Sequence, residues 1–221
     1  MARSRSLTIA AAVLFSLTAS AAPVLAQSAP SSSTWSQEDT VRIIKDVQQK
    51  LGSLTNYAVF DWITFGIHGK TLVLNGYASR PTLKSDAERA VKGIPGIASV
   101  ENKIEVLPYS PNDDRVRAAV YNRIYTAPTL RRYNANQGSL GRAIGPGAGI
   151  ALAAGGITAN PPIGYHAIHI IVKNGNVILY GVVANQSDAA VAGMQANSAP
   201  GAFGITNDIV VQGAPPKEKA K

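Results

Sequence analysis

The chain has 221 residues, enough for one large or two small domains, and its 46% hydrophobic and 15% charged residues are ordinary for a globular protein. It contains no cysteine, which excludes disulfides, thiol catalysis and cysteine-ligated metals. The formal net charge is +8, and it falls to +6 if the first 26 residues, with two arginines and no acidic residue, are removed. This balance favours anionic lipid, envelope polymers or acidic partners over nucleic acid, or else serves solubility alone.

Residues 1–26 have the pattern of a secretory signal peptide. Two arginines precede an apolar run from Leu7 to Leu17, and small residues lead up to a cleavage site near Ala26. We therefore expect export to the periplasm. No cysteine follows the site for a lipid anchor, and no later stretch is apolar enough to span a bilayer. Residues 27–36, rich in serine, alanine and proline, predict a flexible leader.

The next segment predicts a small domain over residues 37–108. Apolar residues at helical spacing predict a first helix that ends at Gly52, and Ser36 with Asp39 forms a weak capping box before it. Alternating residues predict a strand over 59–67, and glycine at the following turn suits a hairpin. A second strand, a helix starting at Pro81 and a closing strand over 99–107 complete the order helix, strand, strand, helix, strand.

The same order repeats further along the chain. Gly76 and Asn102 have counterparts 105 positions later in Gly181 and Asn207, and the offset holds for turn residues as well as apolar ones. The chain is therefore a duplication. We predict an α+β protein with two αββαβ two-layer sandwich modules in tandem. The second module covers residues 112–212, with a hairpin turn at Asn174-Gly175, and residues 213–221 form a tail that we expect to be disordered.

The modules differ by an insert of about thirty residues, from roughly 126 to 164. It contains Arg131, Arg132 and Arg142 and no acidic residue, and then becomes rich in glycine. A loop of this length in a compact module is usually functional or disordered. Its apolar residues are too few to span a membrane but could touch one. The insert is thus either a contact surface or a flexible loop that covers part of the sheet.

No group of residues has a catalytic pattern. His166 and His169 are three apart on a predicted strand, so they point to opposite faces and cannot chelate one metal; His68 lies beside a turn. We expect all three to be surface or turn residues. The carboxylates are scattered, and no pair is forced into a shared pocket. We therefore predict a binding protein that is not an enzyme and needs no metal or cofactor.

The repeated unit resembles the BON domain, named for bacterial osmotic-shock and nodulation proteins. The resemblance lies in the turn-and-strand stretches and the closing stretches, in which Ile97 and Ala202 depart from the valine of the family pattern: Gly69–Gly76, Asn174–Gly181, Ile94–Val106 and Pro200–Val211. It implies a periplasmic, non-catalytic binding protein connected with envelope integrity or osmotic stress. It also implies phospholipid binding, which in tandem members belongs to the second module.

We therefore predict that the second module binds anionic phospholipid or another envelope component. Arginine supplies charge to a headgroup layer, and tyrosine carries a polar tip on an apolar ring. The predicted contact residues are Arg117, Tyr121, Arg123, Arg131, Arg132, Tyr133 and Arg142. The alternative is a protein-interaction or chaperone-like module that uses exposed sheet edges. A carbohydrate binder would need an exposed aromatic platform. The sequence leaves the oligomeric state open.

Overall fold

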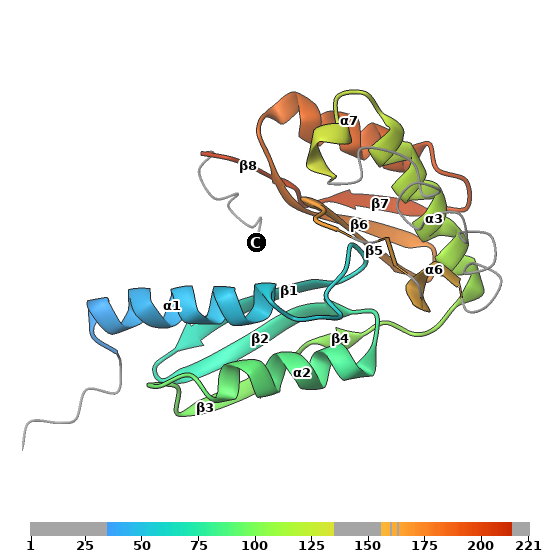
Figure 1. Ribbon diagram of the computed structural model, residues 1–221. Helices are drawn as coiled ribbons and strands as arrows, with labels where there is room; N and C mark the ends of the chain where they lie inside the picture. Colours follow the sequence, from blue (N-terminus) through green and yellow to red (C-terminus); the bar gives the residue numbers. More distant parts are fainter. Residues whose placement is uncertain (1–34, 135–155, 160, 163, 214–221) are drawn as a thin grey trace, which may run out of the picture. The chain divides into compact units, whose positions relative to one another are not determined.

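The structure is a computed structural model (Figure 1), and it describes residues 35–134, 156–159, 161–162 and 164–213. All of these residues belong to one compact unit, Ser33–Lys221. The predicted signal peptide, most of the leader, the glycine-rich stretch with Arg142 and the tail from residue 214 lie outside the described residues.

The first module has the predicted order, and both of its helices pack on one face of its sheet. Strand β2 lies in the middle, antiparallel to β1 and parallel to both β3 and β4. The Ser36 hydroxyl accepts a hydrogen bond from the N–H of Asp39, which confirms the helix cap. The elements are α1 (Gln37–Gly52), β1 (Trp62–His68), β2 (Thr71–Ala78), α2 (Pro81–Lys92), β3 (Ser99–Asn102) and β4 (Glu105–Val106).

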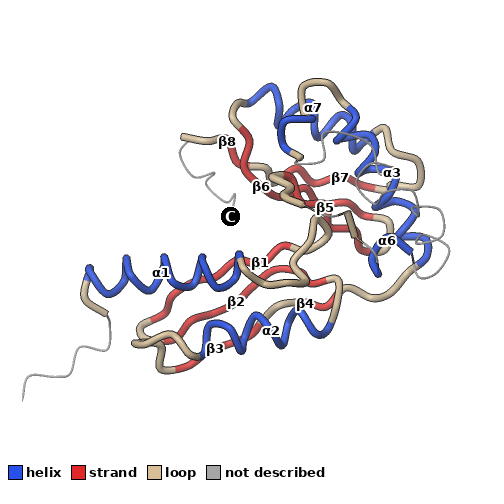
Figure 2. Tube along the Cα trace, viewed as in Figure 1, coloured by secondary structure: helices blue, strands red, loops and turns tan. Residues whose placement is uncertain are grey.

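The second module repeats this arrangement (Figure 2), which confirms the predicted α+β class with two αββαβ units. Strand β6 is the central strand, antiparallel to β5 and parallel to β7 and β8. Among the described residues, two short helices lie between the opening helix and β5, in the predicted insert. The elements are α3 (Pro111–Thr126), η1 (Arg131–Tyr133), α6 (Gly156–Ala159), β5 (Ile168–Lys173), β6 (Asn176–Val183), α7 (Gln186–Asn197), β7 (Gly204–Asn207) and β8 (Val210–Val211).

Each closing strand is split in two, whereas the sequence predicted one continuous strand. In the first module the side-chain oxygen of Asn102 accepts from the N–H of Ile104 at 3.2 Å, and its amide nitrogen donates to the carbonyl of Lys84 in α2 at 2.9 Å. Asn207 makes the same two kinds of bond in the second module. The asparagine interrupts the strand because its side chain takes the place of ladder bonds and joins the strand to the helix.

The first strand also differs from the prediction, because β1 begins at Trp62 and the residues before it belong to another core. Val59 and Phe60 are 1% and 0% exposed, and both lie in the hydrophobic core of the second module. The carbonyl of Val59 accepts from the N–H of Ile170 in β5 at 2.8 Å. The ring of Phe60 meets Tyr121 of α3 edge to face, with 6.5 Å between centroids. The second core is therefore completed by the first module.

The two modules also meet through the sheet faces that carry no helices. Trp62 of β1 stacks on Tyr180 of β6 with ring centroids 5.4 Å apart and planes 2° from parallel. Tyr77 of β2 adds a second stacked contact to Tyr180 at 6.3 Å. An ion pair between Lys173 and Glu105 lies at the same junction. The sequence analysis did not predict this aromatic contact.

Candidate functional site

Three of the predicted contact residues are exposed near the C-terminal end of α3, and we call them the α3-end arginines: Arg123, Arg131 and Arg132. Arg131 donates from Nε to the carbonyl of Thr126, the last residue of α3, at 3.3 Å. A cation there suits the negative end of the helix dipole. Arg132 pairs with Asp188 in the first turn of α7, yet its side chain is 55% exposed. The α3-end arginines thus form a cationic surface beside the start of α7.

Three other predicted contact residues are buried and cannot face a ligand. Arg117, Tyr121 and Tyr133 are 1%, 0% and 9% exposed. Arg117 is paired with Asp114, and the Tyr133 hydroxyl donates to the Asp188 carboxylate at 2.6 Å. For these residues the contact assignment is wrong, because each side chain forms internal bonds that hold α3 and the insert to the rest of the module. Arg142 lies outside the described residues.

The exposed side of α7 carries no charge and includes a large apolar side chain, a feature that the sequence analysis did not identify as a site. Apart from Asp188, which is 4% exposed, α7 has no charged residue, whereas α2 at the same place in the first module has five. Met194 is 62% exposed, and Phe203, in the loop after α7, is 80% exposed. A comparison of the two repeats could have identified Phe203, because the first repeat has the small residue Ala98 at the same position. Phe203 lies near the N-terminal turn of α3, because Asp113 holds the turn on which it rests, so it is at the other end of α3 from the α3-end arginines. Large exposed apolar side chains mark candidate contact surfaces.

Phe203 is held in its exposed position by the hairpin turn between β5 and β6. Asn174 and Gly175 have φ of 52° and 76°, as this tight turn requires. The N–H of Phe203 donates to the carbonyl of Gly175 at 2.9 Å, and a Cβ on Gly175 would meet the Phe203 ring at 2.5 Å. The Asp113 carboxylate fixes the turn by accepting from the N–H groups of Asn174 and Gly175 at 3.0 and 2.8 Å. The ring therefore rests against a glycine, and its other face is open to solvent.

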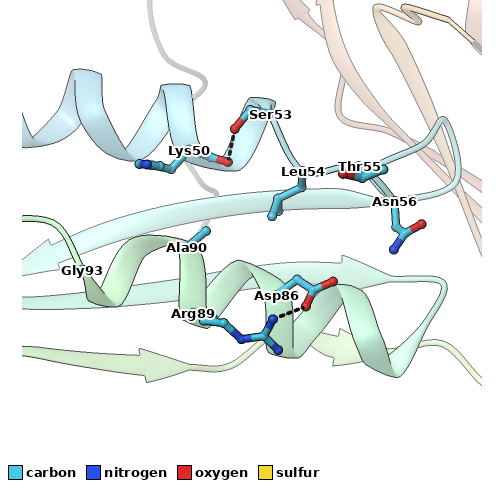
Figure 3. A pocket seen from close by; sticks show the side chains of 9 residues that line it. All are labelled: Lys50, Ser53, Leu54, Thr55, Asn56, Asp86, Arg89, Ala90 and Gly93. Carbon is cyan, nitrogen blue, oxygen red and sulfur yellow. Dashed lines mark hydrogen bonds and ion pairs between the residues drawn. The ribbon is translucent and has the colours of Figure 1, made fainter.

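A polar depression of about 620 Å³ lies in the first module between the end of α1 and α2 (Figure 3). Its charged lining residues are Lys50, Asp86 and Arg89, and Asp86 is paired with Arg89 at 3.2 Å. The lining holds neither a histidine nor a second carboxylate, so it lacks the acid and base pair that proton-transfer catalysis uses. Within the described residues, no group of three metal-ligating side chains is found either.

The family comparison accounts for the repeated unit. The BON domain model matches residues 65–108 and 155–213, which lie in the first and second module respectively. The chain carries two BON domains. These domains are generally non-catalytic and typical of periplasmic, envelope-associated proteins. Met194 and Phe203 lie inside the second region that matches the BON domain model, whereas the α3-end arginines lie outside it.

Among the solved structures that resemble the chain, two are weakly similar. One is CdsD, a structural protein of the Type III secretion system of Chlamydia trachomatis, at 15% identity and a TM-score of 0.24, covering 80% of this chain and 94% of that one. A second, the C-terminal domain of CdsD, has 14% identity and a TM-score of 0.25, covering 79% and 98%. No curated protein matches the chain significantly. Across the described residues, the helices are too short or too polar to cross a bilayer.

Two histidines of the second BON domain are buried, so the prediction that they are surface or turn residues is wrong. His166 and His169 are 4% and 9% exposed. Nδ1 of His166 lies 2.9 Å from the carbonyl of Gly164, so it carries the proton, and Nε2 accepts from the Tyr121 hydroxyl at 3.0 Å. His169 lies against the ring of Trp62, with centroids 5.1 Å apart. Burial lowers the pKa of each histidine from 6.5 to about 4.

We expect these histidines to make the fold sensitive to mild acid. A folded pKa below the unfolded one means that protonation favours unfolding, so stability is complete above pH 6.5 and is lost as the pH falls towards 4. Each histidine should remove about 2 kcal/mol of unfolding free energy between pH 7 and 5. Urea titrations should show a smaller pH slope for His166→Gln and His169→Gln than for wild type. Equal slopes in the three proteins would refute the assignment.

Proposed function

We propose that this chain is an exported, non-catalytic periplasmic binding protein that acts in envelope maintenance or osmotic stress. Its second BON domain engages anionic phospholipid or another envelope component. The observation that carries this proposal is the combination of exposed apolar side chains, Met194 and Phe203, with the α3-end arginines in the same domain. The signal-peptide pattern of residues 1–26 and the absence of cysteine support an envelope location without a lipid anchor.

The chemistry of these two groups of side chains suits a headgroup layer. Guanidinium groups bind phosphate oxygens through paired N–H donors, and each basic residue near an anionic membrane contributes about 1 kcal/mol. Methionine and phenylalanine can enter the boundary between headgroups and acyl chains, as the apolar face of a peripheral helix does. Arg123 forms no ion pair among the described residues, whereas Arg132 already neutralises Asp188. Arg123 and Arg131 are therefore the cations most available to a ligand.

The test is co-sedimentation of the mature protein with vesicles that contain increasing fractions of phosphatidylglycerol, at low and high salt. We expect binding to rise with anionic lipid and to fall with salt, because screening weakens exposed charges. The double variant Arg123→Ala/Arg131→Ala should bind about tenfold to thirtyfold more weakly at low salt. Wild-type binding by this variant would overturn the site assignment.

A matched control keeps the same change in net charge. Lys45→Ala/Lys92→Ala removes two exposed cations, both from the first BON domain and therefore away from the candidate site. It should bind vesicles within about threefold of wild type if binding depends on the site and not on the total charge. Thermal melting of both double variants shows whether the fold is kept, which matters because Arg131 bonds to the end of α3.

A second candidate function is a protein-interaction or chaperone-like role, and the uncharged exposed side of α7 favours it. Met194 and Phe203 would then contact an apolar protein surface, and binding would not weaken as salt screens charge. Met194→Ser/Phe203→Ser separates the two functions when it is combined with the vesicle assay. A protein partner is favoured if wild type does not bind vesicles at either salt concentration and crosslinking in the periplasm captures a partner that this variant loses.

A further inference from the structure

The contact by which the first BON domain completes the second consists of a donor segment and an acceptor groove. The donor segment is Val59–Phe60, immediately before β1. The acceptor groove lies between α3 and the free edge of β5, where the N–H of Ile170 donates to the carbonyl of Val59 and Tyr121 contacts the Phe60 ring. Because the two domains are repeats, each of these parts has a counterpart in the other domain.

The counterpart of the donor segment is exposed. At the repeat offset of 105, Val59 and Phe60 correspond to Gly164 and Tyr165, immediately before β5. Phe60 is 0% exposed, whereas Tyr165 is 73% exposed. The second domain thus presents an aromatic ring at the position from which the first domain inserts one.

The counterpart of the acceptor groove is open. A groove of about 460 Å³ lies beside the edge of β1 in the first domain, and the residues that line it come from α1, the following loop and β1: Gln48, Leu51, Gly52, Tyr57, Trp62, Ile63, Thr64 and Phe65. Leu51 corresponds to Tyr125 when the two capping serines, Ser36 and Ser110, are superposed in sequence. Phe65 corresponds to Ile170, the residue whose N–H holds Val59.

The register of the two hairpins shows that the backbone of this edge is oriented for the same contact. Phe65 pairs with Leu74 as Ile170 pairs with Leu179, so the N–H of Phe65 points to the free edge of its sheet as that of Ile170 does. The groove can therefore offer both a backbone donor and an apolar slot. Gln48, at its rim, adds a polar group that could bond a tyrosine hydroxyl but has no use for a phenylalanine.

We propose that a second copy of this chain inserts its Gly164–Tyr165 segment into the groove between α1 and β1, repeating between molecules the contact that joins the two BON domains within one. The ring of Tyr165 fills the slot, and the carbonyl of Gly164, which already accepts from Nδ1 of His166, accepts a second hydrogen bond from the N–H of Phe65. Each copy has one donor and one acceptor on different domains, so the contact is heterologous and builds a ring or an open chain of copies. This assembly is independent of lipid binding.

The first test is sedimentation velocity of the mature protein over a concentration series without lipid. We expect self-association with a dissociation constant below about 100 µM. Tyr165→Ser should weaken association at least tenfold, and Tyr109→Ser, at another exposed tyrosine, should not change it. On the groove side Gln48→Trp should block association, while Gln49→Trp, the exposed neighbour that does not line the groove, should not. A wild-type protein that stays monomeric to about 500 µM would overturn the proposal.

Mixing the two blocked proteins distinguishes this contact from other forms of association. Tyr165→Ser retains the groove and Gln48→Trp retains the donor segment, so an equimolar mixture should form one-to-one dimers that cannot extend. No dimer in the mixture, or species as large as those of wild type, would refute the heterologous contact. A photoreactive benzoylphenylalanine at position 165 should crosslink to the groove residues of a second copy, and the same group at position 109 should not.

Discussion

Arg117→Ile should lower the free energy of unfolding by about 3–5 kcal/mol, because it leaves a buried carboxylate without its partner. Nη1 of Arg117 donates to Asp114 and to the Thr158 hydroxyl at 2.8 and 2.9 Å, and Nη2 donates to the carbonyl of Val172 at 2.8 Å. Asp114 is 6% exposed, and its second oxygen already lacks a hydrogen-bond partner. Urea unfolding at neutral pH measures the loss.

The first BON domain supplies the control for this prediction. At the positions of Asp114 and Arg117 it has Thr40 and Ile43, and Ile43 is fully buried. The double variant Asp114→Thr/Arg117→Ile removes both charges together, so it should recover more than half of the stability that the single variant loses. If the double variant is as unstable as the single one, the loss comes from packing and not from an unpaired charge.

Gly181→Ala should cost about 3 kcal/mol or more, because the new methyl group has no room and the backbone has the wrong conformation. Gly181 has φ of +133°, and a Cβ there would lie 1.9 Å from the carbonyl oxygen of Ala167. That oxygen belongs to the backbone, so the two strands of the hairpin would have to separate. Thermal or urea unfolding of the variant gives the magnitude.

The first domain allows the same substitution to be tested at the equivalent glycine. Gly76 has φ of +115°, and its Cβ would lie 1.9 Å from the carbonyl oxygen of Trp62, so Gly76→Ala should cost as much in the first domain. Gly66→Ala is the control, since a Cβ at Gly66 would meet nothing within 4 Å. It should change stability by less than about 0.5 kcal/mol. A similar effect at Gly66 and Gly181 would contradict the steric explanation.

The elements that the sequence predicted well are those specified by local residues. Glycines at turns, a serine cap and apolar periodicity placed both hairpins and four helices, and the constant offset of 105 identified the second copy. Two features depended on side-chain bonds instead. The split of each closing strand comes from an asparagine that bonds to a helix, and the short β1 comes from Val59 and Phe60 packing in the other domain. A periodic pattern indicates that a residue is buried, but it does not indicate in which hydrophobic core the residue lies.

The candidate site could be predicted only in part. Arg123, Arg131 and Arg132 were expected to be exposed because charged side chains usually are, and they are. The same reasoning failed for Arg117, whose partners Thr158 and Val172 lie 41 and 55 residues away in the sequence. Conversely, exposed apolar residues such as Met194 and Phe203 look like core residues until the fold shows which side of the domain they occupy.

The placement of Val59 and Phe60 gives the two domains an unequal relationship during folding. The hydrophobic core of the first domain contains only its own residues, whereas that of the second includes these two residues from the first. The ribosome releases the N-terminal half first, so the first domain can fold before the second, with the Phe60 side chain exposed to water until the second domain forms. The second domain then folds against a template that is already formed. The domain that is synthesised first is therefore the one that the other domain needs to complete its core.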